Sequence, residues 1–204
     1  WAGGLPATVG GAVRGNAGAF GGEMKDSVEE IESFDAAILS PRTRSRDDCQ
    51  FAYRSSVFRT RKGDEIVLRA ALKLEKGDAN VIARAIREKV QYRLDRHPME
   101  YPNIGSIFKN VPAEEFGLGM GEDEGVPQTT ATLTRGGRTY AVPVKLDPFA
   151  VVPAAYLISE AGLKGYRAGG AEVSEKHPNF IVNTGGAKAA DVRELIAIVE
   201  GRVR

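Results

Sequence analysis

The sequence predicts an α+β protein, and three patterns lead to this fold class. In residues 66–75, Ile66 and Leu68 begin an alternation with the period of two that a half-buried strand requires. Apolar residues then recur four apart over residues 78–94, as they do on one face of a helix. A pair of glycines at 136–137, flanked by strand-like runs, is typical of a β-hairpin with a primed turn. The spacing of apolar residues changes at Gly77 from the period of a strand to that of a helix, and we therefore place a domain boundary near residue 76.

The composition is typical of a globular chain. With 204 residues, 42% of them hydrophobic, the protein can bury a sizeable core. The 28 basic residues nearly balance the 27 acidic ones, so no overall field attracts a polyanion and we expect no nucleic acid as partner. The sequence has no apolar run of roughly 20 residues and no signal peptide, so we expect a cytoplasmic protein without a membrane segment. Because the chain has a single cysteine, it cannot form an internal disulfide. With only two histidines besides, we predict no metal site.

The first 22 residues carry eight glycines and a proline. This density favours backbone turns over a packed helix, and we interpret the segment as a loop around a ligand. Inward-facing N–H groups of such a loop can bind a diphosphate, although glycine-rich segments are more often ordinary tight turns. The spacing is not that of a Rossmann G-x-G-x-x-G turn, so a nicotinamide domain of that type is not predicted.

The remaining elements follow from their periods. A helix is predicted from Asp78, its N-cap, to Leu94, with Ile82, Ile86 and Val90 on the same face as Leu94. Residues 113–128 are rich in glycine and acid and have no period, which predicts a mobile loop.

The C-terminal third is predicted to contain a hairpin and two helices. The hairpin strands span 130–135 and 138–144, and a short helix over 154–161 ends at Gly162. The last helix is predicted from an apolar stripe made of Val192, Leu195, Ile196, Val199 and Val203.

Four blocks along the chain resemble one known family. Residues 4–22 read GLPATVGGAVRGNAGAFGG, residues 49–58 read CQFAYRSSVF, residues 97–110 read HPMEYPNIGSIFKN, and residues 160–183 read EAGLKGYRAGGAEVSEKHPNFIVN. In this order they resemble the UDP-N-acetylenolpyruvoylglucosamine reductase (MurB) family. The resemblance implies part of an FAD-binding domain over residues 1–76 and a mixed α/β substrate-binding domain over residues 77–204. The latter would carry an insertion at about 113–153, interpreted as surface decoration or, less favoured, as a lid.

The resemblance also implies an activity. This is the FAD-dependent, NADPH-driven reduction of UDP-N-acetylglucosamine enolpyruvate to UDP-N-acetylmuramate, a step of peptidoglycan synthesis for the cell wall. On the glycine-rich segment, the implied FAD contacts are Pro6, Ala7, Thr8, Gly10, Gly11, Asn16, Ala17 and Gly18.

Two residues match the catalytic positions of the family. Arg54 would stabilise the negative charge that builds on the substrate, because a guanidinium is always charged and binds carboxylate with a planar fork. Ser106 would give a proton to the carbanion-like carbon, helped by the nearby Lys109 cation. The family's remaining catalytic acid, a glutamate, is expected beyond Arg204.

Other matching positions are candidate substrate contacts. They are Tyr53, Lys109 and Asn110, with Arg96, His97 and Lys176 as candidates for phosphate or carboxylate groups. For His97 and His177 a structural role is an equal alternative. Cys49 is interpreted as a small buried residue, since the mechanism has no use for a thiolate.

The chain also departs from the family pattern. Ala7 stands where the family usually has glycine. The amino-terminal part of the flavin domain does not match any segment of the chain, so by itself this polypeptide is expected to bind FAD poorly and to turn over little. Two alternatives stay open, namely another FAD-dependent oxidoreductase and an inactive truncated paralogue. The presence of Arg54 and Ser106 argues against the second.

Overall fold

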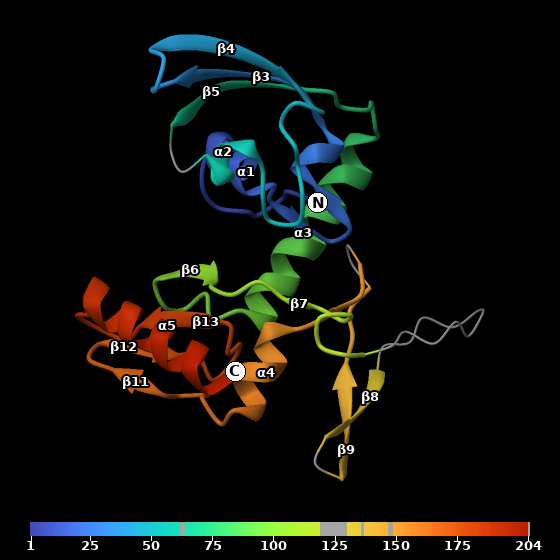
Figure 1. Ribbon diagram of the computed structural model, residues 1–204. Coiled ribbons are helices and arrows are strands. Elements are labelled where there is room, and N and C mark those ends of the chain that lie inside the picture. The colour runs from blue at the N-terminus through green and yellow to red at the C-terminus, as the bar shows by residue number, and fades with distance from the viewer. Residues whose placement is uncertain (62–63, 119–129, 136, 147–148, 204) are drawn as a thin grey trace. The chain divides into compact units, whose positions relative to one another are not determined.

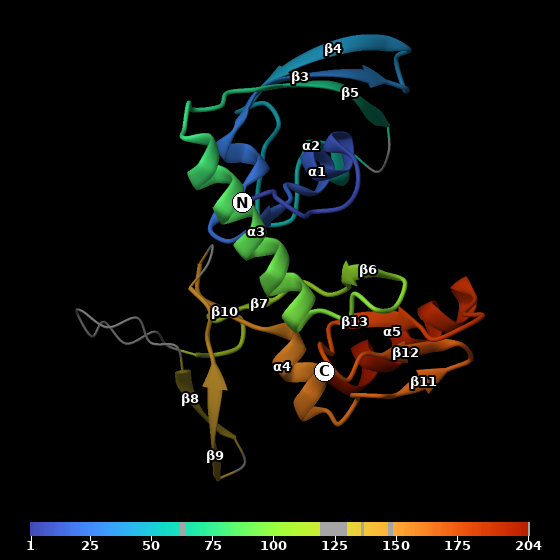
Figure 2. The same ribbon diagram turned by 180° about the vertical axis from the view of Figure 1, so that it is seen from behind.

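A computed structural model describes residues 1–61, 64–118, 130–135, 137–146 and 149–203, and the chain forms two compact units, Trp1–Gln91 and Tyr92–Arg204 (Figures 1 and 2). Helices and strands occur in both units, which confirms the predicted α+β class. The division lies inside helix α3 (Ala79–Arg96), later in the chain than the predicted boundary near residue 76. The assignment of flavin and substrate domains to either side of residue 76 stays a prediction.

The first unit is built on a three-stranded antiparallel sheet with strand order β4-β3-β5. Helices α1 and α2 lie on the same face of this sheet (Figures 1 and 2). Up to α3, its elements are α1 (Val9–Gly15), β1 (Gly18–Ala19), β2 (Gly22–Glu23), η1 (Met24–Asp26), β3 (Val28–Asp35), β4 (Ser40–Ser45), α2 (Val57–Thr60) and β5 (Glu65–Leu72). The core between helices and sheet consists of Val13, Met24, Val28, Ile31, Cys49, Val57 and Phe58.

Helix α1 corrects the prediction that the glycine-rich segment is only a loop. Thr8 caps the helix by accepting a hydrogen bond from the Gly11 N–H to its Oγ1 at 3.1 Å. Asn16 ends it in the left-handed conformation, with φ of 43°. Glycines weaken a helix by roughly 1 kcal/mol each. The complete burial of Val13 and the two caps outweigh the cost of the glycines. The amino-acid composition alone shows neither the burial nor the caps.

Strand β5 confirms the predicted strand, but its buried face differs from the one that the alternation implies. Ile66 and Leu68 are 55% and 59% exposed, whereas Val67 and Ala70 pack against the core. The reason is tertiary, because Gly10 of α1 lies against Val67 and so determines which face is covered. Irregular register between β3 and β5 further interrupts the alternation.

A buried carboxylate connects the three strands of this sheet. Glu65 of β5 accepts two hydrogen bonds from the Arg44 guanidinium of β4, at 2.7 and 2.8 Å, and one from the Ser33 hydroxyl of β3 at 2.5 Å. Arg44 lowers the pKa of the Glu65 carboxyl from 4.5 to about 2. This ion pair therefore persists at all but strongly acidic pH.

Helix α3 begins as predicted but is more exposed than predicted. The Asp78 carboxylate accepts hydrogen bonds from the N–H groups of Asn80 and Val81, both at 2.9 Å, which confirms the N-cap. Its apolar stripe is not covered, since Ile82, Ile86 and Leu94 are 47%, 42% and 49% exposed. Among the described residues, no helix combines the length and apolar character needed to cross a bilayer.

The second unit contains a four-stranded antiparallel sheet with strand order β11-β12-β13-β6. Its elements after α3 are β6 (Asn103–Ser106), β7 (Val111–Pro112), β8 (Thr130–Arg135), β9 (Arg138–Pro143), β10 (Val151–Val152), α4 (Ala154–Glu160), β11 (Arg167–Ala168), β12 (Ala171–Val173), β13 (Phe180–Asn183) and α5 (Ala189–Val203). The predicted last helix is confirmed as α5, whose residues Leu195 and Val199 pack into the core against the sheet. Helix α4 is confirmed too, and Gly162 follows it with φ of 67°.

The predicted insertion has a small core of its own. The hairpin is confirmed as β8 paired with β9, and Gly137 takes a positive φ of 74° in its turn, while Gly136 lies outside the described residues. Ala113 and Leu118 are buried and joined by a backbone hydrogen bond of 3.0 Å, so the part of the predicted mobile loop that the structure describes is a packed turn. Residues 119–128 of that loop lie outside the described residues. The segment packs onto Tyr156 and Leu157 of α4.

Candidate functional site

Arg54 lies in a tight turn of the first unit. Ala52 and Ser55 exchange backbone hydrogen bonds of 3.1 and 3.0 Å, and Arg54 between them has a positive φ of 51°. A non-glycine residue rarely adopts this conformation and retains it only where its surroundings enforce it. Ser56 follows, buried, and donates its hydroxyl proton to the Arg14 carbonyl at 2.7 Å. The turn is therefore fastened to the end of α1.

The guanidinium of Arg54 is held by the segment that follows α1. Its Nη2 donates to the Gly18 carbonyl at 2.6 Å, and its Nη1 donates to the Asn16 carbonyl at 3.5 Å. A Cβ atom on Gly18 would lie 2.9 Å from Nη1, closer than real Cβ contacts. Glu23 Cγ, at 2.7 Å, and the Gly22 carbonyl oxygen, at 2.9 Å, also crowd this position, so a side chain at residue 18 would clash on several sides.

Asn16 is fully buried and joins three segments of the chain. Its Nδ2 donates to the Ala52 carbonyl at 3.0 Å and to Glu23 Oε2 at 3.1 Å, and its Oδ1 accepts from the Lys25 N–H at 3.0 Å. Of the predicted cofactor residues, Asn16 and Gly18 thus contact the turn of Arg54. A flavin contact at these two positions stays a prediction.

Most of the other predicted cofactor residues line one hollow of about 400 Å³ in the first unit. Its lining includes Pro6, Ala7, Thr8, Gly11 and Ala17, together with apolar side chains such as Trp1 and Leu5. Gly10 instead packs against Val67. A mostly apolar hollow beside turns with exposed backbone suits a flat aromatic ring system.

Ala7 occupies a position where the backbone favours glycine, since its φ is 97°. We expect Ala7→Gly to raise the free energy of unfolding by about 1 kcal/mol, because glycine adopts this φ without the clash of a Cβ atom. Urea unfolding of the protein without ligand measures the change.

The same substitution in a helix is the control for this prediction. Ala83 lies inside α3, where we expect Ala83→Gly to lower the free energy of unfolding by about 1 kcal/mol. A loss of stability in Ala7→Gly comparable to that in Ala83→Gly would show that the position 7 backbone is not strained.

The second predicted catalytic residue lies in the second unit. Ser106 ends β6, opposite Phe180 of β13, and is exposed. Asn110, predicted to bind substrate, accepts a hydrogen bond at its Oδ1 from the Ala154 N–H at 3.1 Å, at the start of α4. Lys109 is exposed on the rim of a hollow of about 480 Å³ that also contacts α4 and α5. Ser106, Lys109 and Asn110 therefore lie on one short segment that is anchored at both ends.

The two histidines form an aromatic cluster with Phe180. Their ring centroids are 5.3 Å apart, and each lies within 5 Å of the Phe180 ring. Burial, followed by the charges of His177 and Arg93, lowers the pKa of His97 to about 4. Burial lowers the pKa of His177 as well. At neutral pH both rings are uncharged, so His97 could bind a phosphate oxygen only as an N–H donor.

The cationic candidates beside this cluster have protein partners. Lys176 Nζ donates to the Leu94 carbonyl at 2.9 Å and lies 3.7 Å from the Glu100 carboxylate. The Arg96 guanidinium lies over the Tyr92 ring at 4.2 Å. These interactions position both side chains near the end of α3, and contact with substrate phosphates stays a prediction.

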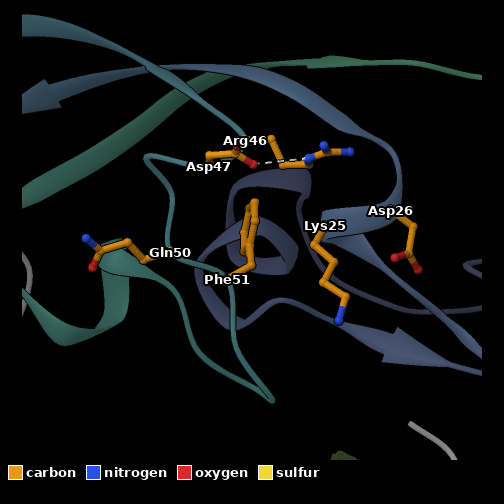
Figure 3. Close-up of a pocket in the computed structure, with 6 residues that line it drawn as sticks. All are labelled: Lys25, Asp26, Arg46, Asp47, Gln50 and Phe51. Carbon is orange, nitrogen blue, oxygen red and sulfur yellow. Dashed lines mark ion pairs between the residues drawn. The ribbon is translucent and has the colours of Figure 1, made fainter.

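Three further features limit which chemistry the described residues can carry out. Cys49 is fully buried, as predicted, and this burial raises the pKa of its thiol to about 11. Within the described ranges, no group of His, Cys, Asp and Glu is arranged to hold a metal ion. A hollow of about 430 Å³ lined by charges of both signs contains none of the predicted site residues (Figure 3).

Glu23 is a residue that sequence reasoning missed. It is 6% exposed, its Oε2 accepts from Lys25 Nζ at 2.9 Å, and its Oε1 lies 3.8 Å from Arg54 Nη1. The sequence feature that could have pointed to Glu23 is its position, because it is the first acidic residue of the chain and directly follows the glycine-rich segment.

The fold and the site together define an α+β protein in which a partly apolar hollow and a firmly held arginine belong to one unit. The sequence profile of the family described as "UDP-N-acetylenolpyruvoylglucosamine reductase, C-terminal domain" matches residues 97–204. The chain therefore belongs to the UDP-N-acetylenolpyruvoylglucosamine reductase family.

Individual relatives extend this similarity to nearly the whole chain. The reductase of Fervidobacterium nodosum is 35% identical over 201 residues, covering 98% of this chain and 52% of the relative. The reductase of Syntrophus aciditrophicus is 39% identical over 201 residues, covering 98% and 51%. The crystal structure of the Thermus caldophilus reductase superposes with a TM-score of 0.68 at 32% identity, over 97% of this chain and 57% of that one. The chain spans about half the length of the curated relatives it matches.

Proposed function

We propose that the protein carrying this chain is a cytoplasmic, FAD-dependent reductase that uses NADPH to convert UDP-N-acetylglucosamine enolpyruvate to UDP-N-acetylmuramate for peptidoglycan synthesis. The observation that carries the proposal is the 35–39% identity to reductases of this name over nearly the whole chain. Because the chain spans only about half of those relatives, activity, cofactors and substrates are proposals for the protein and not properties of this segment alone.

The hollow in the first unit is the part of the chain that fits a flavin. Five of the eight predicted cofactor residues line it, and its apolar wall would exclude water from one side of a bound ring. When bound, FAD would supply the hydride for the enol ether. Pro6, Ala7 and Thr8 would hold it through backbone at a turn without bulky side chains.

Arg54 is suited to the charge that appears during this reaction. Hydride addition to the outer carbon leaves negative charge on the neighbouring carbon and its carboxylate, and a fixed cation stabilises that charge without reorganising. The guanidinium is 34% exposed, so it is anchored by carbonyl groups but remains open to a ligand.

Ser106 would then donate a proton to the carbon that carries the charge. A serine hydroxyl is a weak acid, but an enolate carbon is a strong base, and the nearby Lys109 can stabilise the alkoxide that results. Tyr53, whose ring lies 5.1 Å from the Arg54 guanidinium carbon, and Asn110 would help to place the sugar nucleotide.

The test is an assay on the full-length gene product. With FAD and NADPH present, we expect oxidation of the nicotinamide, followed by its absorbance, to depend on added UDP-N-acetylglucosamine enolpyruvate. UDP-N-acetylglucosamine without the enolpyruvyl group is the control and should support no oxidation. Equal nicotinamide oxidation with and without the enolpyruvyl group would refute the proposed function.

A further inference from the structure

We propose that Glu23 is a positioning residue for Arg54, and that its buried carboxylate sets the orientation of the guanidinium during reduction of the substrate. This inference rests on the proposed function. It adds a residue that acts through Arg54 and does not itself touch the substrate.

The first line of argument is the burial of the carboxylate. Glu23 is 6% exposed, and a carboxylate is costly to bury unless cations and hydrogen-bond donors compensate it. Its Oε2 has both, from Lys25 Nζ at 2.9 Å and Asn16 Nδ2 at 3.1 Å. Among the residues that the structure describes, its Oε1 accepts no hydrogen bond, and it lies 3.8 Å from Arg54 Nη1. One oxygen is thus anchored, and the other is left for the guanidinium.

The second line is how closely the groups fit around Gly18. A Cβ atom there would lie 2.7 Å from Glu23 Cγ and 2.9 Å from Arg54 Nη1, so both side chains fill the space on the same side of this glycine. The Gly18 carbonyl also accepts the 2.6 Å hydrogen bond from Arg54 Nη2. Carboxylate, glycine and guanidinium therefore form one packed group, in which moving one member displaces the others.

The third line of argument is where the two cations, Lys25 and Arg54, lie relative to the Glu23 carboxylate. Lys25 lines the charged hollow of Figure 3 and is 46% exposed, so it reaches Glu23 from the solvent side. Arg54 lies against the other oxygen and, within the described part of the chain, its remaining N–H groups donate to no residue. With its Nη1 and Nη2 directed to protein oxygens, the guanidinium is held in one orientation.

Glu23→Gln is the first variant to measure, in the full-length protein with FAD bound. Glutamine keeps the size of the side chain and an oxygen for Asn16 but removes the charge. We expect the maximal rate at which the enolpyruvyl substrate oxidises the reduced flavin to fall about tenfold to hundredfold, the scale of a misplaced catalytic group. The rate of flavin reduction by NADPH should stay within about twofold, since that step does not use Arg54. Glu32→Gln is the matched control, because Glu32 is exposed and, among the described residues, forms an ion pair only with Arg69, at 3.7 Å.

A double-mutant cycle with Arg54→Lys separates positioning from structural support. Lysine lacks the planar fork that Glu23 orients, so Glu23→Gln should cost no more than about twofold in this background. If the Gln variant does not fold, Glu23→Asp replaces it in the cycle, because it keeps the charge but withdraws it from Arg54. An unchanged rate in the single variant, or an equal loss in both backgrounds, would overturn the inference. A wild-type protein that shows no substrate-dependent oxidation would instead refute the proposed function.

Discussion

Replacing Arg54 with alanine is expected to slow the reduction of UDP-N-acetylglucosamine enolpyruvate by about 10²- to 10³-fold, the cost of removing one fixed group that stabilises developing charge. The side chain donates to the carbonyls of Gly18 and Asn16 but does not line the hollow proposed for FAD. Flavin absorbance and flavin reduction by NADPH should therefore be retained. Stopped-flow measurement of each half-reaction distinguishes the two steps.

Two further variants define what the guanidinium contributes. Arg54→Lys retains a charge without the planar fork and should recover part of the lost rate. Arg69→Ala removes an exposed arginine of the same unit, whose side chain is 79% exposed, and should leave both half-reactions unchanged. Retained turnover in Arg54→Ala would remove this residue from the proposed mechanism.

Replacing Ser106 with alanine is expected to lower the rate of product formation by about 10²- to 10⁴-fold, the usual contribution of a positioned proton donor. Ser106 lies at the exposed end of β6 and outside the buried cores of the second unit, so stability should change little. Reduction of the flavin by NADPH should continue at the wild-type rate, while UDP-N-acetylmuramate, measured by chromatography, should accumulate slowly.

Ser106→Cys tests the same role through acidity. A thiol has an unperturbed pKa of about 8.5 and donates a proton more readily than a hydroxyl, so partial activity that declines above that pH is expected. Ser40→Ala, at the start of the edge strand β4 of the first unit, is the control and should match wild type. A wild-type rate of product formation in Ser106→Ala would exclude this hydroxyl as the proton donor.

Part of the fold could be predicted from local patterns, namely β5, the hairpin β8–β9 and helices α3, α4 and α5. Asp78 caps α3, Gly162 follows α4, and the hairpin β8–β9 turns at its glycine pair, because each of these features depends on a few neighbouring residues. Helix α1 could not be predicted in this way. Its glycines disfavour a helix, and besides the two caps, packing of Val13 against residues far along the chain compensates them.

The candidate site likewise has residues that the sequence could predict and residues that it could not. The motif pattern gave Arg54 and Ser106 as candidate catalytic residues, and these roles stay predictions, while the comparisons show the family. The pattern did not identify Glu23, because its relation to Arg54 joins residues that are far apart in sequence. It assigned Asn16 and Gly18 to the cofactor, which stays a prediction, and it did not show that both residues contact Arg54 or its turn.

The sequence by itself determined the α+β class, the family resemblance and the approximate ends of α3 and α4, and it supplied the candidate catalytic residues, whose roles stay predictions. These properties depend on residue type and on short-range spacing. Only the tertiary structure decided which face of β5 is covered, that the glycine-rich segment forms a helix, and that a buried carboxylate lies beside Arg54. Each of these depends on the free energy of burying groups from distant parts of the chain, and the period of a single segment contains no information about it.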